Sequence, residues 1–223
     1  MIDALLAPGV AAAEAFADPD DLELLPAETS LVARAVDKRR SEFTTARGLA
    51  RRALGSLGVE PVPILRGEKG QPLWPRGVVG SLTHCDGYRA AVVAYKLQCR
   101  SVGIDAEPHG ALPEGVLDHV TLAPERDVLA TRPGDIHWDR LLFCAKEATY
   151  KAWFPLTERW LGFEDAHITF ERDATSDGDV TATGTFRSEL LVDGSVIDGG
   201  EPLRSFDGRW RIENGLVVTS ICL

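Results

Sequence analysis

The chain has 223 residues, 44% of them hydrophobic, so it can bury the core of one large domain or of two small packed ones. Its 34 acidic residues outnumber 24 basic ones, and the net charge of −10 argues against nonspecific binding of nucleic acid or of an anionic membrane. No apolar run approaches the roughly 18 residues that a membrane-spanning helix needs.

The four cysteines, listed here as Cys85, Cys99, Cys144 and Cys222, show neither C-x-x-C spacing nor the histidine-interleaved spacing of a zinc site. The first residues also lack the basic and then apolar pattern of a signal peptide. We therefore expect a reduced, cytoplasmic protein in which Cys85 and Cys144 are small buried side chains.

The first third of the chain predicts one long helix. Up to about Pro26 alanines mix with acidic residues, and we expect a short strand or turn there that takes no part in the core. From Asp37 to about Leu57 apolar residues recur at helical spacing, with Asp37 as the candidate N-cap and Gly58 as the stop. A loop is expected at 61–75.

Strands and a second helix are expected next. Apolar runs predict strands at 78–82, 89–95 and 101–104, and a helix at 136–154 that is ended by Pro155. In the last seventy residues, hairpins of an antiparallel sheet are predicted at the Asp-Gly pairs that begin at Asp177, Asp193, Asp198 and Asp207, and at Asn214-Gly215. A helix-then-strands order thus occurs twice, with a boundary near residue 102.

Two carboxylates fall in the segment GIDAE at 103–107. Side chains two apart in a strand point to the same side, so Asp105 and Glu107 can both reach one cation. Oxygen-only ligands suit Mg²⁺ or Mn²⁺ better than zinc. The alternative is a solvated strand end.

The second motif is FCAKEATYKAW at 143–153. On a helix Glu147 and Lys151, four apart, share a face, and Lys146 lies one residue round the turn. A helix rich in lysine and glutamate is otherwise typical of a solvated surface. Either motif alone leaves both interpretations open, but their co-occurrence favours a metal site that faces a phosphate site.

With these two motifs the chain resembles the 4′-phosphopantetheinyl transferases of the large monomeric type, which carry a G-I-D-x-E segment and a W/F-x-x-K-E-A-x-x-K helix. These enzymes modify carrier proteins of polyketide, nonribosomal peptide, siderophore and lipid synthesis. Further segments also resemble the family: the basic helix at 38–47, the G-x-K-G-x-P loop at 66–72, the S-x-S/T-H segment at 81–85, and WLGFEDAHI at 160–168, which is similar to the actinobacterial subgroup.

The resemblance implies an α+β fold with a pseudo-twofold arrangement of two similar halves, residues 1–101 and 102–223. Each half would pack a small antiparallel sheet with a long helix. Coenzyme A would lie between the halves, and interfaces of this kind are frequent pocket sites. The resemblance also implies a monomer.

The implied reaction is the transfer of 4′-phosphopantetheine from coenzyme A to a serine of apo acyl or peptidyl carrier proteins, which releases adenosine 3′,5′-bisphosphate. The metal ligands would be Asp105, Glu107 and Glu147, with Mg²⁺ expected and Mn²⁺ as the alternative. Glu147 would also be the base for the serine hydroxyl, directly or through a water. Lys151 would stabilise or protonate the leaving oxygen.

Contacts with coenzyme A are assigned by the same resemblance. Besides Asp105 and Lys151, the expected contacts are Arg39, Arg47 and His84 at phosphate, Arg66, Lys69 and Thr83 at the nucleotide end, and Lys146 at the pyrophosphate. Many relatives have a lysine where this chain has Gln71, which leaves the adenine contact open among Gln71, Arg66 and Lys69. For the basic helix the alternative is a solvated face, and for His84 a structural hydrogen bond.

Two other functions stay open on the residues alone. A metal-dependent phosphohydrolase acting on a nucleotide or on coenzyme A could use the same carboxylates to activate water. A noncatalytic carrier-binding module could keep the fold without the activity, although intact Asp105, Glu107, Glu147 and Lys151 argue against it.

Overall fold

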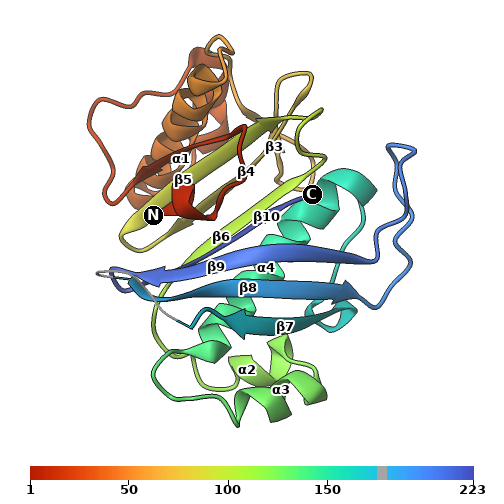
Figure 1. Cartoon of the computed structure of the whole chain (residues 1–223). Helices are drawn as coiled ribbons and strands as arrows, with labels where there is room; N and C mark the ends of the chain where they lie inside the picture. The colour runs from red at the N-terminus through yellow and green to blue at the C-terminus, as the bar shows by residue number, and fades with distance from the viewer. Residues whose placement is uncertain (175–179) are drawn as a thin grey trace.

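The computed structural model describes residues 1–174 and 180–223, so the hairpin expected at Asp177 lies outside the described residues. The described residues form two large antiparallel sheets, each covered by one long helix, and a small two-stranded sheet (Figure 1). The helices are α1, Asp37–Ser56, and α4, Trp138–Thr157. The expected α+β class is confirmed.

The first sheet has three strands in the order β1-β5-β4, and their bounds are Val10–Ala15, Tyr88–Tyr95 and Val78–Cys85. Helix α1 packs on its outer face, where Leu49 and Ala53 meet Ala91 and Val93 of β5. Residues of β5 alternate between its two faces, as a strand with both sides buried requires. The even-numbered residues of β5 therefore face the second sheet.

The second sheet has five strands in the order β6-β10-β9-β8-β7. Their bounds are Val102–Pro108, Leu216–Cys222, Ser205–Glu213, Val180–Leu190 and Ala166–Arg172. Helix α4 covers one face with a core that includes Leu141, Trp153 and Trp210. Strands β9 and β10 are joined at Asn214 and Gly215, both with positive φ, so this predicted hairpin is confirmed.

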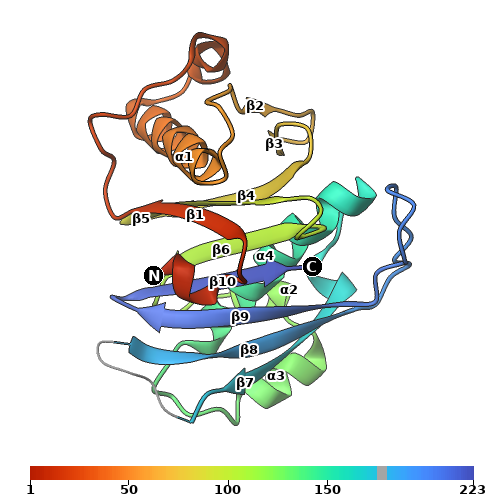
Figure 2. The same cartoon turned by 45° about the horizontal axis from the view of Figure 1, so that its top comes forward.

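A third core lies between the two sheets, where Tyr88 and Val92 of β5 contact Ile104 and Ala106 of β6. The molecule is thus layered as α1, first sheet, second sheet and α4 (Figure 2). The neighbouring strands β4 and β6 belong to different sheets and are joined through side chains. The backbone N–H groups of Ile104 and Ala106 donate to Ser81 Oγ at 3.1 Å and to Thr83 Oγ1 at 3.0 Å.

Short elements complete the fold: η1 Ile2–Leu5, η2 Pro26–Val32, β2 Leu65–Arg66, β3 Pro72–Leu73, α2 Val116–Val120, α3 Ala123–Leu129 and η3 Phe163–Asp165. The expectation that the N-terminal segment stays outside the core is wrong. Ile2 and Leu5 are buried between the sheets, because their spacing of three places both on one side of a 3₁₀ turn. The alanine-rich β1 pairs with β5 along its whole length.

Two predicted helix boundaries also need correction. Pro155 does not end α4. It lies in the last turn, where its missing N–H costs one hydrogen bond, and the helix continues to Thr157, with Glu158 as its C-cap at φ +51°. Asp37 is the first helical residue and Val36 is the N-cap. Gly58, at φ +76°, follows the end of α1 as predicted.

The Asp-Gly pairs are mostly not hairpin turns. Asp207-Gly208 lies inside β9, where a Cβ on Gly208 would come within 2.2 Å of the Phe186 ring, so this glycine serves packing. Asp193-Gly194 and Asp198-Gly199 lie in the long connection between β8 and β9. The prediction is therefore wrong for Asp207-Gly208, whereas the other two pairs lie between antiparallel strands but in a long connection and not in a tight turn.

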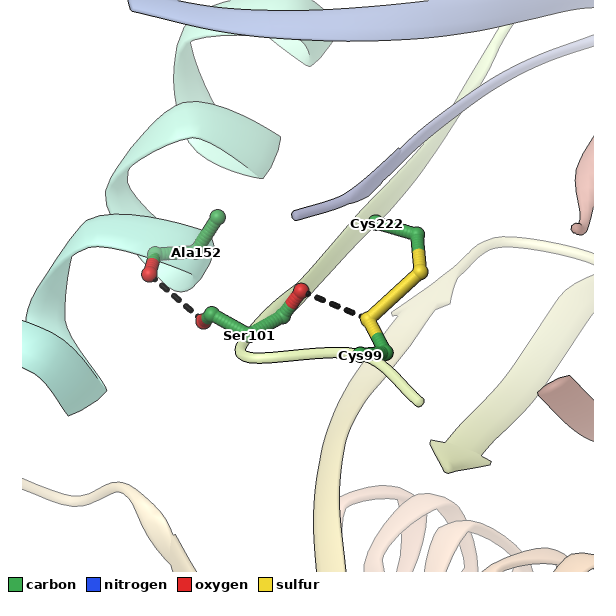
Figure 3. Close-up of a disulfide and its surroundings, with 4 residues drawn as sticks. All are labelled: Cys99, Ser101, Ala152 and Cys222. Atoms are coloured by element: carbon green, nitrogen blue, oxygen red, sulfur yellow. Dashed lines mark hydrogen bonds between the residues drawn. A yellow bond between two sulfur atoms is a disulfide. The ribbon is translucent and has the colours of Figure 1, made fainter. Parts of the chain in front are cut away.

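The structure contradicts the expectation of four reduced cysteines, because Cys99 and Cys222 form a disulfide (Figure 3). Their Cα atoms lie 5.9 Å apart, since the register of β10 sets Cys222 opposite Val102. Cys85 and Cys144 are free, and burial raises the pKa of both thiols, that of Cys85 to about 12. Neither is a reactive thiolate at neutral pH.

Within the described part of the chain, no helix is both long and apolar enough to cross a bilayer.

Candidate active site

A cavity of about 510 Å³ lies between α1 and α4, over β4, with the β2–β3 loop on one side. Seven of the residues predicted from the sequence line it: Arg39, Arg47, Arg66, Lys69, His84, Glu147 and Lys151. Basic groups come mainly from α1 and the β2–β3 loop, whereas Glu147 comes from α4. The cavity can therefore accept an elongated ligand that carries several phosphates.

Strand β6 and helix α4 approach each other closely at Gly103. A Cβ at this position would lie 2.0 Å from the carbonyl oxygen of Ala148, so only glycine fits. Since alternate residues of a strand share a face, Asp105 and Glu107 are presented to the same helix. The close packing brings both carboxylates alongside Glu147 and Lys151.

Asp105 is buried and held through one oxygen. Its Oδ1 accepts hydrogen bonds from Lys151 Nζ at 2.7 Å and from Thr83 Oγ1 at 3.1 Å. Its other oxygen, Oδ2, is buried and, by hydrogen-bond geometry, has no partner among the described residues. A buried carboxylate oxygen without a partner is costly, so this atom is suited to a ligand that supplies positive charge.

Glu107 is half-buried and pairs with Arg140 of α4, whose Nη1 donates to Oε2 at 2.9 Å. Burial and the nearby Asp105 raise the pKa of Glu107, against the opposing effect of Arg140. Sequence reasoning did not single out Arg140. Arg140 could have been found from the sequence, because it lies seven residues before Glu147 and both therefore lie on one face of the helix.

Glu147 lines the cavity, and its side chain makes no hydrogen bond or ion pair with any residue in the described part of the chain. Burial raises its pKa, and repulsion from Asp105 and Glu107 adds to the shift against the effect of Lys151. Three carboxylates therefore act on one another here. Their negative charges are only partly balanced by Lys151 and Arg140, so the group favours binding of a cation.

Lys151 stays protonated in this setting. Burial disfavours its cation, but the charge and hydrogen bond of Asp105 outweigh burial and raise the pKa of Lys151. Its Nζ also donates to the carbonyl of Ile104 at 3.0 Å. The lysine thus contacts β6 while lining the cavity.

Among the described residues, no three His, Cys, Asp or Glu side chains are arranged closely enough to coordinate one metal ion. The residues nevertheless fit a hard divalent cation, because their donors are all carboxylate oxygens and Asp105 Oδ2 is buried without a partner.

On the α1 side of the cavity, Arg39 Nη1 lies 2.7 Å from His84 Nε2. A guanidinium can only donate, so Nε2 accepts and the ring proton is on Nδ1, which faces Glu42 Oε2 at 3.5 Å. Burial and then Arg39 lower the pKa of His84, which makes the ring neutral at pH 7. Glu42 also lines the cavity, and sequence reasoning missed it.

Arg47 is buried beside the same cavity. Its Nε donates to the carbonyl of Ile64 at 2.7 Å, and its guanidinium lies 4.2 Å from the centre of the Phe43 ring. Burial lowers the pKa of Arg47 to about 10, so the group is still a cation at neutral pH. One edge of the guanidinium is thus anchored by the fold.

Lys146, which the resemblance assigns to the pyrophosphate, does not line this cavity. It is buried, and Nζ contacts Glu125 Oε2 at 2.8 Å and the carbonyl of Phe163 at 2.6 Å. Adjacent helical residues point about 100° apart, so Lys146 faces α3 and η3 when Glu147 faces β6. Its charge is already neutralised by Glu125.

Thr83 also differs from its predicted role, because it is buried and does not line the cavity. Its hydroxyl donates to Asp105 and accepts from the N–H of Ala106. Thr83 therefore positions a carboxylate and joins the two sheets. The apolar side of the cavity was also missed; Trp74, Tyr150, Phe154 and Pro155 form it.

Comparison with known proteins agrees with this geometry. Residues 27–94 match the 4′-phosphopantetheinyl transferase N-terminal domain, and residues 101–198 match the 4′-phosphopantetheinyl transferase superfamily. The chain is 61% identical over 222 residues to the 4′-phosphopantetheinyl transferase Npt of Nocardia iowensis, covering 99% of both chains.

Two further relatives are similar over nearly the whole chain. Identity is 60% over 215 residues to the 4′-phosphopantetheinyl transferase PptT of Mycobacterium tuberculosis, which covers 96% of this chain and 92% of the relative. It is 51% over 229 residues to the 4′-phosphopantetheinyl transferase Svp of Streptomyces mobaraensis, which covers 100% and 89%. The chain belongs to the 4′-phosphopantetheinyl transferase superfamily, enzymes that move phosphopantetheine from coenzyme A to carrier proteins.

Proposed function

We propose that this transferase requires Mg²⁺, with Mn²⁺ as a substitute, and that Asp105, Glu107 and Glu147 hold the cation. The observation that carries the proposal is the buried, partnerless Oδ2 of Asp105 beside two carboxylates whose pKa values are raised. When bound, the cation would neutralise charge on the pyrophosphate of coenzyme A.

Glu147 accepts the proton of the carrier serine, directly or through a water. The proposal is supported by its place on the cavity wall and by burial, which raises its pKa toward the range of an efficient general base. It also has no partner among the described residues to compete for its oxygens.

Lys151 stabilises the departing adenosine 3′,5′-bisphosphate. Its raised pKa keeps it cationic, and it lies on the cavity wall next to Glu147. Phosphoryl transfer needs mainly positioning and charge neutralisation, so no covalent enzyme intermediate is involved.

The nucleotide end of coenzyme A lies among Arg39, Arg47, Arg66, Lys69 and His84. This placement is supported by their shared position on the cavity wall, which Glu147 also lines. Gln71 also lines the cavity and is held by the N–H of Lys69 at 3.1 Å, so it is the candidate for the adenine contact.

Residues 1–101 and 102–223 form the two halves, because each contributes one sheet and one long helix. We further propose a monomer that works in the cytoplasm, where coenzyme A and carrier proteins are found. Its carriers serve polyketide, nonribosomal peptide, siderophore or lipid synthesis.

The test is intact-protein mass spectrometry of an apo acyl or peptidyl carrier protein incubated with the enzyme, coenzyme A and Mg²⁺, beside an EDTA control. A gain of one phosphopantetheine that EDTA abolishes supports the proposal. Equal gain in EDTA contradicts the metal requirement. Consumption of coenzyme A with an unchanged carrier would indicate the hydrolase instead.

Glu147→Ala should abolish transfer while sparing the fold. The control is Glu158→Ala, which changes another acidic residue on the cavity wall. If Glu147→Ala transfers near the wild-type rate, Glu147 is neither base nor metal ligand.

A further inference from the structure

Arg140 is the second cation on the α4 stripe that carries Glu147 and Lys151. Lys151 pairs with Asp105 at one end of the carboxylate group, and Arg140 pairs with Glu107 at the other. Two cations of one helix therefore bracket two carboxylates of one strand. The role of Lys151 is covered by the proposed function, but that of Arg140 is not.

The guanidinium of Arg140 is fixed by three contacts. Nη1 donates to Glu107 Oε2 at 2.9 Å, Nε to the carbonyl of Gly110 at 3.1 Å, and Nη2 to the carbonyl of Ala111 at 2.8 Å. Both carbonyls belong to the segment that follows β6. Because a guanidinium presents its donors in one rigid plane, these contacts orient the Glu107 carboxylate relative to the strand that bears it.

The two carboxylates of β6 are held in the same way. Asp105 is bound through Oδ1 and leaves Oδ2 without a partner. Glu107 is bound through Oε2, and within the described residues no hydrogen bond reaches its Oε1. Each carboxylate thus has one oxygen fixed by a cation of α4 and one oxygen free.

From this arrangement we infer that Arg140 is a positioning residue for the divalent cation, holding Glu107 through one oxygen so that the other is presented to the metal. The inference rests on the proposed function, which places the cation among these carboxylates. A ligand that is already oriented loses less freedom on binding, and such partners commonly account for about 10–100-fold in metal affinity.

Electrostatic repulsion between Arg140 and the metal would change the metal affinity in the opposite direction. A guanidinium close to a divalent cation repels it, and an arginine that had to leave Glu107 before the metal could bind would weaken the affinity. Removing Arg140 would then tighten metal binding. The sign of the change therefore decides between positioning and competition.

The experiment is a Mn²⁺ titration of the enzyme with coenzyme A but no carrier protein, followed by the electron paramagnetic resonance signal of free Mn²⁺. Arg140→Gln should weaken Mn²⁺ binding about tenfold, and Arg140→Lys by less, since lysine keeps the charge but cannot make all three contacts. Arg172→Gln, which breaks the exposed Arg172–Asp135 pair, is the control and should bind Mn²⁺ like wild type.

A rate measurement separates positioning from general damage. The Mg²⁺ concentration for half-maximal transfer should rise in Arg140→Gln, and saturating Mg²⁺ should restore the rate at an unchanged KM for coenzyme A. In a Glu107→Gln background, adding Arg140→Gln should cause no further loss of Mn²⁺ affinity. Thermal unfolding confirms that each variant is folded, and Arg140→Lys carries the test if the glutamine variant is not.

Unchanged or tighter Mn²⁺ binding by a folded Arg140 variant, beside normal binding by wild type, overturns the inference. Wild-type protein that binds no Mn²⁺ overturns the metal site of the proposed function itself, and the inference with it. The two failures are therefore told apart by the wild-type titration.

Discussion

The ammonium group of Lys151 reaches β6 twice, at Asp105 Oδ1 over 2.7 Å and at the Ile104 carbonyl over 3.0 Å. One side chain of α4 thereby holds both the backbone and a carboxylate of the neighbouring strand. The contact also leaves Asp105 with a single uncommitted oxygen, Oδ2. Lys151 consequently shapes the carboxylate site in addition to lining the cavity.

Lys151→Ala should lower transfer by at least about 100-fold, because it removes a fixed positive charge from the reacting centre and leaves Asp105 without its cation. Single-turnover mass spectrometry of the carrier measures the loss. The matched control is Lys96→Ala, which removes an exposed lysine after β5. A variant that retains wild-type turnover would show that this ammonium group has no part in the reaction.

Thr83→Val should reduce the free energy of unfolding by roughly 1–3 kcal/mol, since it removes the acceptor of the buried Ala106 N–H and one donor to Asp105. Urea denaturation gives the difference. Thr83→Ser keeps the hydroxyl and should stay close to wild type. Equal stability of the valine variant would contradict the role of this hydroxyl at the junction of the sheets.

Gly103→Ala should destabilise the protein by roughly 1–3 kcal/mol or more, because the added methyl group meets the carbonyl of Ala148 and pushes α4 away from β6. Thermal unfolding and transfer should both suffer. Gly134→Ala is the matched control, since nothing lies within 4 Å of its new Cβ. If both alanine variants unfold alike, the close approach of helix and strand is not as described.

Lys146→Met should destabilise the fold by roughly 3–5 kcal/mol, because Glu125 is left as a buried charge without its cation. The KM for coenzyme A of the protein that remains folded should not change. A raised KM at wild-type stability would instead restore the pyrophosphate role that the sequence suggested. Denaturation and steady-state kinetics on the same preparation distinguish the two.

Glu147→Gln should stabilise the metal-free protein at neutral pH while abolishing transfer. A carboxyl group whose pKa is raised by folding contributes stability below its unfolded pKa and loses it as pH rises through the folded pKa. The gain from glutamine should therefore grow as the pH rises above about 4, the ordinary pKa of a glutamic acid, and level off once the pH exceeds the raised pKa of the folded state. Thermal midpoints in EDTA check it, and a glutamine variant less stable than wild type at the higher pH would contradict the direction of the shift.

The sequence correctly predicted the elements whose structure depends on residues close to one another in the chain. Helix α1, the stop at Gly58 and the turn at Asn214-Gly215 follow from periodicity and from backbone conformation that a few neighbouring residues decide. The family followed from the resemblance at 103–107 and 143–153, and the comparisons confirm it. These predictions did not depend on how the sheets pack.

The errors arose where tertiary contacts decide. The resemblance assigns Lys146 to the pyrophosphate, whereas in the fold Lys146 is paired with Glu125 of α3. The pair Asp207-Gly208 predicts a turn, but glycine is required at 208 because the ring of Phe186 packs against it. Cys99 and Cys222 are 123 residues apart and meet only through the register of β6 and β10. Such relations cannot be read from spacing along the chain.

The hydroxyl groups of Ser81 and Thr83 stand in for a backbone ladder between β4 and β6, and Asp105 lies in that junction. The junction that unites the two sheets therefore also positions the carboxylate that we propose as a metal ligand. A fragment with one sheet and its helix would lack one side of this junction. Separation of the sheets should therefore disturb Asp105 even where each sheet stays folded.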